Sequence, residues 1–292
     1  MKIIDKVYGE EEIKEQVVVD LINSNPLQRL KNISQFGMPD RYYHKKGFSR
    51  YEHSIGVLIL LRRLNASLNE QIAGLLHDSS HTAFSHVIDW VLGDPSKEDY
   101  QDNRHSEFIK NSSVADILGE NDFSIEKIGD LHSFHLLDYP APDLCADRID
   151  YTLREIFLGE NLKDINEILK GLVVFKSRIV FNNKDSAFVF SNHYLKFNRE
   201  HWAGNEAKAR CHILAEILRE ALSKNIISNK DVEEKDDYEI LALLERSKED
   251  EIINNLDLLK RGFKISESLD QEGVILKKKF RYVDPLVLQN GK

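Results

Sequence analysis

Three stretches of the chain decide its fold: RYEHSIGV at residues 50–57, AGLLHDSSHTAFSH at 73–86 and DLCADRIDYTLRE at 143–155. In and around them, apolar residues recur three or four positions apart, which is the period of an amphipathic helix. Each stretch also carries histidine or acidic side chains. We therefore expect three helices that bring these polar side chains together.

The segments around these stretches extend the helical pattern, with two interruptions. Helical spacing runs through most of the first 170 residues, but GMPDRYYHKKGFSR at 37–50 has Gly, Pro and a basic-aromatic cluster without a period, which is typical of a loop at a site. Around 171–182, GLVVFKSRIVFNN is rich in β-branched and aromatic residues and predicts a short β-hairpin. Residues 184–225 return to a helical pattern.

The last part of the chain is more charged and its pattern is weaker. Its tail, VILKKKFRYVDPLVL, alternates enough to predict a late strand. A length of 292 residues fits one catalytic domain with a smaller appendage. We expect a mostly α fold: a helical catalytic domain over 1–225, interrupted by the hairpin, and a small mixed α+β appendage over 226–292.

Composition excludes several classes of protein. No apolar run approaches the roughly 20 residues that span a bilayer, and the acidic beginning differs from a signal peptide, so we expect a soluble cytoplasmic protein without membrane contact. The net charge of -9 argues against extensive nucleic-acid binding. Cys145 and Cys211 form no Cys-x-x-Cys pair, so a metal site must use histidine and carboxylate ligands.

His77 and Asp78 are adjacent at an expected helix end, where Ser79 and Ser80 tolerate a turn. An imidazole and a carboxylate together suit a divalent ion such as Mn, Fe, Mg, Zn or Ni, and the sequence does not distinguish these metals. In a chain with 11 histidines, a single His-Asp pair is more often a helix-terminal hydrogen bond. The pair gains meaning only together with other motifs.

The third stretch supplies such a motif. On a helix, Asp147, Tyr151 and either Arg154 or Glu155 share one face. Taken alone, this face predicts either a solvated surface or the wall of a polar cleft.

The ordered set of His, His-Asp and Asp, with its flanking words, resembles the HD superfamily of metal-dependent phosphohydrolases, in particular the deoxynucleoside triphosphate triphosphohydrolase branch. The resemblance extends back to NPLQRLKNISQFG at 25–37 and forward to about Trp202. It implies an HD-type helical bundle that binds one divalent ion. The ligands it implies are His53, His77, Asp78 and Asp147.

The resemblance also implies roles for further residues. Phosphate contacts fall to Arg50 and Arg148, and sugar contacts to Gln35, Tyr151 and Glu155. The proton-handling group would be His81, His86, Asp89 and His105. Two departures matter: Ser79-Ser80 replaces the usual hydrophobic-Gly pair before His81, and Phe36 stands where the family has a smaller residue beside the sugar.

Three functions follow from these motifs. The first is hydrolysis of a dNTP to deoxynucleoside and triphosphate, which Arg50, Arg148 and Tyr151 favour because a polyphosphate needs local positive charge. The alternatives are an HD nucleotidase or phosphodiesterase acting on monophosphates or cyclic nucleotides, and a non-catalytic nucleotide-binding HD scaffold. The resemblance further implies a homo-oligomer.

Two other groups of residues carry a weaker expectation. The tail cations predict a solvated strand edge rather than a binding site; they are Lys277, Lys278, Lys279 and Arg281. The histidines His193, His201 and His212 predict packing or surface roles rather than metal binding.

Overall fold

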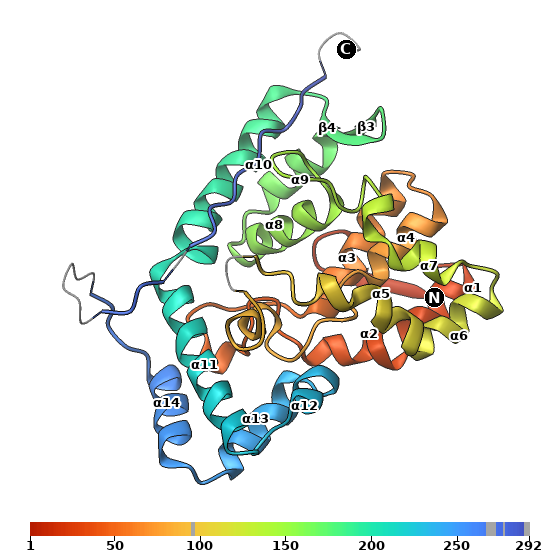
Figure 1. Ribbon diagram of the computed structural model, residues 1–292. Helices are drawn as coiled ribbons and strands as arrows, with labels where there is room; N and C mark the ends of the chain where they lie inside the picture. Colours follow the sequence, from red (N-terminus) through yellow and green to blue (C-terminus); the bar gives the residue numbers. More distant parts are fainter. Residues whose placement is uncertain (95–96, 267–272, 277, 289–292) are drawn as a thin grey trace.

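Helices dominate the computed structural model, which describes residues 1–94, 97–266, 273–276 and 278–288 (Figure 1). Within these ranges, strands pair only in two short antiparallel hairpins, β1–β2 and β3–β4. The elements in chain order are β1 (Lys2–Asp5), β2 (Gly9–Glu12), α1 (Gln16–Asn23), α2 (Asn25–Arg29), η1 (Leu30–Asn32), η2 (Asp40–Tyr42), α3 (Arg50–Arg63), α4 (Leu68–Leu76), η3 (Ser85–Trp90), α5 (Asp102–Asn111), α6 (Ser113–Glu120), α7 (Ile125–Gly129), η4 (Leu131–Ser133), α8 (Ala146–Leu158), α9 (Leu162–Gly171), β3 (Leu172–Phe175), β4 (Arg178–Phe181), α10 (Lys184–Phe197), η5 (Asn198–Trp202), α11 (Asn205–Ser223), α12 (Asn229–Glu234), α13 (Asp237–Arg246) and α14 (Asp250–Arg261).

Helix α3 is the centre of the larger hydrophobic core. It begins at a capping box, in which the Ser49 hydroxyl accepts from the Glu52 amide and the Glu52 carboxylate accepts from the Ser49 amide. The helix is buried on nearly all sides from residue 53 to residue 61, because α4 and α8 pack against it. This packing places α4 and α8, which follow from the second and third quoted stretches, alongside α3, which follows from the first.

A glycine permits the close crossing of α3 and α8. A Cβ atom on Gly56 would lie 2.0 Å from Asp150 Oδ1 and 2.1 Å from Arg154 Nη2. Since no side chain fits there, the Asp150 and Arg154 side chains of α8 pack directly against α3 one turn after His53. The first turn of α8, which carries Asp147, therefore lies beside α3.

The hairpin predicted around 171–182 is confirmed: β3 and β4 pair antiparallel, with Leu172 opposite Phe181 and Phe175 opposite Arg178. The N-terminal hairpin β1–β2 was not predicted, because β2 has the acidic sequence GEEE and shows neither β-branched residues nor an alternating pattern. The mostly helical fold is confirmed as well.

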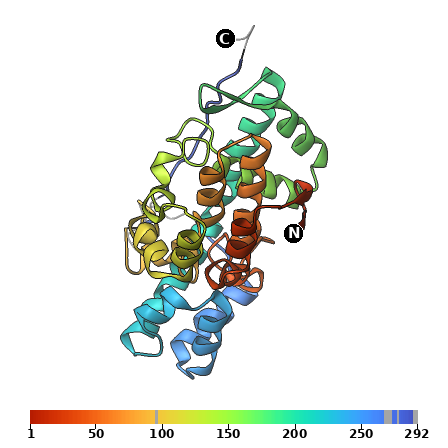
Figure 2. The same cartoon turned by 90° about the vertical axis from the view of Figure 1, so that its right-hand side faces the viewer.

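The C-terminal part is built on a second hydrophobic core. Helices α13 and α14 share this core with α11 and η3, so it spans both sides of residue 225. In both views α13 and α14 lie at one end of the molecule and the β3–β4 hairpin at the other (Figure 2). The division at residue 225 stays a prediction.

The tail crosses the molecule from one end to the other. Residues 278–288 run in extended form alongside α10 toward β4 (Figure 1). The predicted late strand is reduced to a single parallel bridge between Phe181 and Val287, so the described part of the appendage is helical and extended rather than mixed α+β. Among the described helices, none is both long and apolar enough to cross a membrane.

Candidate metal centre

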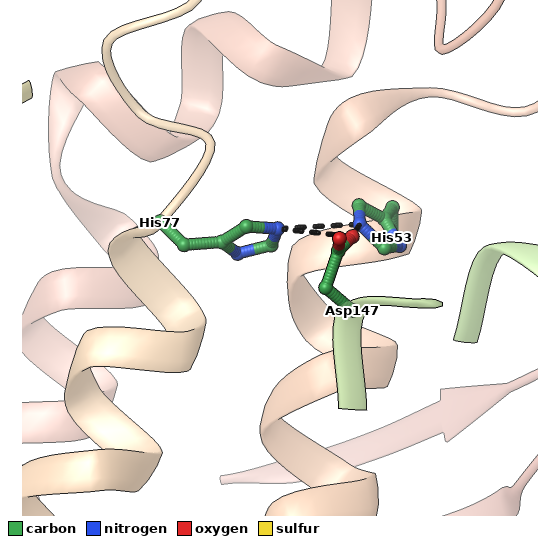
Figure 3. A group of neighbouring side chains, drawn as sticks. All are labelled: His53, His77 and Asp147. Atoms are coloured by element: carbon green, nitrogen blue, oxygen red, sulfur yellow. Dashed lines mark hydrogen bonds and ion pairs between the residues drawn. The ribbon is translucent and has the colours of Figure 1, made fainter. Parts of the chain in front are cut away.

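Three side chains from three different elements face one another (Figure 3). His53 lies on α3, His77 caps the end of α4 and Asp147 lies in the first turn of α8. Their ligand atoms lie within 4.8 Å of one another. His53 Nε2 is 2.9 Å from Asp147 Oδ1 and 3.2 Å from His77 Nε2.

The orientation of both imidazoles favours metal binding. His53 Nδ1 donates to Asp150 Oδ2 at 2.6 Å, and His77 Nδ1 donates to the Gly74 carbonyl at 2.7 Å. Because each Nδ1 donates its proton to these partners, Nε2 is the nitrogen left to bind an ion, and both Nε2 atoms are directed into the group. Two imidazole nitrogens and a carboxylate oxygen form a suitable donor set for a divalent ion.

Asp78, the fourth predicted ligand, borders this group. Its Oδ1 lies 3.5 Å from His77 Nε2, and its Oδ2 lies 3.8 Å from His53 Nε2. Oδ2 also accepts from Arg50 Nη1 at 2.7 Å. The turn expected after Asp78 is present, since α4 ends at Leu76 and the His81 amide donates to the Asp78 carbonyl at 3.0 Å.

The charges of the group depend on one another. Burial opposes ionisation of His53, but hydrogen bonds with Asp147 and Asp150 raise its pKa to about 9. Burial also opposes the charge on Asp78, yet the Arg50 guanidinium holds the pKa of that carboxyl well below its usual range. The site therefore retains protons on its imidazoles, which a divalent ion would displace.

The metal group opens into a cavity of about 450 Å³, which we call the main cavity. Six of the nine residues predicted to bind substrate or handle protons lie on its wall. They are Gln35, Arg50, His81, His86, Arg148 and Tyr151.

Arg50 and Gln35 each have an unused hydrogen-bonding atom. Arg50 donates through Nη1 to Asp78 and through Nε to Ser85 Oγ at 2.7 Å, but its buried Nη2 has no partner among the described residues. Gln35 Oε1 is likewise buried and unpartnered within the described chain. Buried polar atoms are rarely left unpaired. The two unpartnered atoms therefore indicate that the main cavity binds a ligand.

Arg148 and Tyr151 are held in place by other groups. Arg148 Nη1 donates to the carbonyls of Asp143 at 2.7 Å and Tyr139 at 3.2 Å. The Tyr151 and Tyr194 hydroxyls are 2.8 Å apart, and both residues line the main cavity. These contacts fix a guanidinium and a phenol pair close to Asp147.

The predicted proton-handling group is divided. His81 and His86 are neighbours on the cavity wall, with ring centroids 5.0 Å apart. Asp89 lies behind His86, 3.2 Å from its Nδ1. His105 is not among the lining residues of the main cavity in the described chain; its Nδ1 contacts Ser80 Oγ at 3.0 Å, and burial lowers its pKa to about 4.

Glu155 is placed differently from the expectation. Its carboxylate accepts from Trp202 Nε1 at 2.6 Å and pairs with His201 Nδ1. Both oxygens of Glu155 are therefore bound by side chains of η5. It is not a lining residue of the main cavity as far as the structure describes the wall. The arrangement gives its predicted sugar contact no support, whereas His201 has the packing role expected of it.

Two features of the site were not part of the sequence prediction. Asp150, which orients His53, follows Asp147 by three positions on the same helix, and this spacing could have revealed it. A second, more aromatic cavity of about 160 Å³ adjoins the main cavity and contains Phe36, Tyr43 and Trp202. The residues common to both cavities are Gln35, His86, Glu98, Tyr151 and Arg281.

Comparison with known proteins agrees with this geometry. The family model described as HD domain matches residues 50–156, which contain all four predicted ligands. The chain is 38% identical to the uncharacterized protein YdhJ of Bacillus subtilis, over 100% of this chain and 90% of YdhJ. It is 35% identical to the metal-dependent phosphohydrolase cns2 of Cordyceps militaris, over 68% of this chain and 60% of cns2.

Two further similarities are more distant. The deoxynucleoside triphosphate triphosphohydrolase SAMHD1 of Danio rerio is 34% identical over 30% of this chain and 16% of that protein. The crystal structure of a phosphohydrolase from Bacteroides thetaiotaomicron superposes with a TM-score of 0.60 at 21% identity, over 88% of this chain and 69% of the other. The latter similarity concerns the fold alone.

Proposed function

This chain belongs to the HD-domain family of metal-dependent phosphohydrolases, and from that premise we propose that it hydrolyses a nucleoside triphosphate, preferably a dNTP to deoxynucleoside and triphosphate. The observation that carries the proposal is the unpartnered Nη2 of Arg50 in the described structure, on a wall that also presents Arg148. Two guanidinium groups beside a divalent ion suit a substrate with several phosphate charges.

In such a reaction, different residues would bind the ion, bind the phosphates and hold the proton. An ion held by His53, His77 and Asp147, with Asp78 beside them, would polarise a phosphoryl oxygen or activate water. Arg50 and Arg148 bind and orient the phosphates. His86, which lies on the cavity wall with Asp89 behind it, is suited to hold a proton near the leaving oxygen.

The sugar would lie beside Gln35 and Tyr151, where the two cavities meet. Gln35 Oε1 can accept from a sugar hydroxyl. Phe36 is fixed next to it by edge contacts with Phe48 and His201, whose ring centroids lie 5.3 and 4.4 Å away. A fixed bulky ring at this place favours a sugar without a 2′-hydroxyl, in line with the similarity to SAMHD1.

The second candidate is a nucleotidase acting on monophosphates, because the same metal group serves both reactions. Product analysis separates the two. The metal-loaded protein is incubated with dNTPs, NTPs and monophosphates, and the products are resolved by chromatography. We expect deoxynucleoside and triphosphate from dNTPs; a preference for monophosphates would replace our proposal with the nucleotidase.

Removal of Arg148 tests the same point through kinetics. Charge-assisted hydrogen bonds contribute about 1.5–3 kcal/mol each, so Arg148→Ala should lower kcat/KM for a dNTP by roughly ten- to a hundredfold. The effect on a monophosphate should be much smaller. Arg62→Ala is the control, since Arg62 lies at the far end of α3 and pairs with Glu15. Equal losses on both substrates would contradict the proposal.

The assembly and location of the protein stay predictions. We expect a homo-oligomer in the cytoplasm, in keeping with the resemblance to the triphosphohydrolase branch.

A further inference from the structure

The C-terminal tail forms part of the wall of the main cavity. Four of its residues line the cavity together with the metal group: Lys279, Phe280, Arg281 and Tyr282. We call residues 278–288 the tail wall. Lys278 and Lys279 are exposed, as expected of solvated cations, whereas Arg281 is partly buried at the cavity wall. Lys277 lies outside the described residues.

The tail wall is attached at both of its ends. At the far end, the Phe181 amide donates to the Leu286 carbonyl at 2.9 Å and the Leu288 amide donates to the Phe181 carbonyl at 2.8 Å. Nearer the cavity, the Asp284 amide donates to the Pro142 carbonyl at 2.9 Å. Lys278 bonds to Asn205 at the start of α11. Arg281 is therefore held between fixed points.

Glu98 is the counterion of this wall. Its buried carboxylate pairs with Arg281 and lies 3.5 Å from Lys279 Nζ and 3.6 Å from Lys208 Nζ. Although burial opposes the charge, these cations lower the pKa of Glu98 to about 2. One carboxylate thus faces three cations. The cluster has a local excess of positive charge, which favours a further anion.

Arg281 also has a distinctive position. It lines both the main cavity and the aromatic cavity, as do Glu98 and Gln35. A substrate that extends from the metal group into the aromatic cavity would pass this guanidinium. Arg50 and Arg148, by contrast, belong to the wall that carries the metal ligands.

We propose that Arg281 is a specificity-determining residue that binds a phosphate group of the substrate away from the ion, in competition with its ion pair to Glu98. The inference rests on the proposed function, because that function supplies a substrate with several phosphates. A planar guanidinium meets two oxygens of a phosphate as well as it meets a carboxylate. Lys279 adds a second positive charge at the same place.

Binding of inorganic tripolyphosphate tests the inference without requiring turnover. Metal-loaded protein, freed of unbound metal, is titrated calorimetrically with tripolyphosphate and separately with inorganic phosphate. We expect Arg281→Gln to weaken tripolyphosphate binding about tenfold and phosphate binding less than twofold. Lys278→Gln is the control: it removes the same charge from the tail but contacts Asn205 instead of the cavity.

A second variant distinguishes binding from mere attachment of the tail. If Arg281 only held the tail, Glu98→Gln would break the same ion pair and weaken binding as well. If Arg281 binds phosphate, Glu98→Gln removes its competitor and tripolyphosphate binding should tighten severalfold. Loss of affinity in both variants, or equal affinity in Arg281→Gln and wild type, would overturn the inference. A wild-type protein that binds tripolyphosphate no tighter than phosphate would overturn it too.

The failure of the proposed function would give a different pattern. If no dNTP were hydrolysed but Arg281→Gln still weakened tripolyphosphate binding selectively, the anion site would stand and only the reaction would need revision.

Discussion

The two walls of the main cavity are built in different ways. The inner wall, formed by α3, α4 and α8, carries His53, His77 and Asp147 on packed helices of the larger core. The tail wall is an extended segment held by a few backbone hydrogen bonds and the ion pairs to Glu98. A rigid helical wall suits the ion, whose ligands must keep their geometry, whereas the tail wall offers charges to a substrate.

The inner wall can be broken by one added methyl group. Gly56→Ala would place a Cβ 2.0 Å from Asp150 Oδ1, so the buried side chains of Asp150 and Arg154 would have to move. Overpacking of this kind costs about 1–3 kcal/mol, and the contact is at the severe end, so we expect a loss of about 3 kcal/mol in the free energy of unfolding. Denaturant unfolding measures it.

Gly119→Ala is the matched control for this prediction. Gly119 also lies in a helix, α6, and a Cβ there meets nothing within 4 Å. The control should be neutral or stabilised by up to about 1 kcal/mol, since alanine favours helix. Equal effects of the two substitutions would show that the crossing of α3 and α8 is not closely packed.

The two walls should also differ in how they respond to pH. The pKa of His53 is raised to about 9, so its protonation stabilises the metal-free protein, and that stabilisation is lost as pH rises from about 6.5 through 9. An ion needs the unprotonated imidazole, so it binds better over the same range. The gap in melting temperature between metal-loaded and metal-free protein should widen from pH 6.5 to 9, each displaced proton adding about 1.4 kcal/mol per pH unit at most.

Although burial opposes its ionisation, the Asp78 carboxylate raises the pKa of His77, which changes the gap in the same direction as His53. Titrating groups outside the metal group do not disturb this comparison. Burial raises the pKa of Asp237 to about 7, but this carboxyl affects both forms of the protein and cancels in the difference. Glu98, with its pKa lowered to about 2, contributes stability above about pH 4.5 and loses it only as pH falls toward 2. The tail wall is therefore unaffected between pH 6.5 and 9. A constant gap across that range would contradict the role given to His53.

The sequence predicted the inner wall well because its information is local. His53, His77 and Asp147 each lie in or next to a stretch with helical spacing of apolar residues, which places them on or at the end of a helix. Residues 171–182 likewise carry a hairpin pattern of their own. Glu155 shows the limit of this reasoning. A shared helix face indicated that it points with Tyr151, but only the fold reveals that η5 takes its carboxylate.

The tail wall could not be predicted, since it depends on a contact across 183 residues. The ion pair of Glu98 and Arg281 joins two distant segments, and the alternating pattern of the tail does not indicate which segment the tail contacts. The same run of cations on an isolated strand edge would be solvated. Long-range packing alone turns Arg281 toward the cavity.

Metal content tests the central claim most directly. Elemental analysis of purified wild-type protein should find one divalent ion per chain, and His77→Ala and Asp147→Ala should each retain less than about a tenth of it while remaining folded. His193→Ala is the control, because His193 also pairs with a carboxylate, Asp164 at 2.7 Å, but away from the group. It should keep the wild-type content. Full metal content in folded His77→Ala and Asp147→Ala would contradict the assignment of the metal centre.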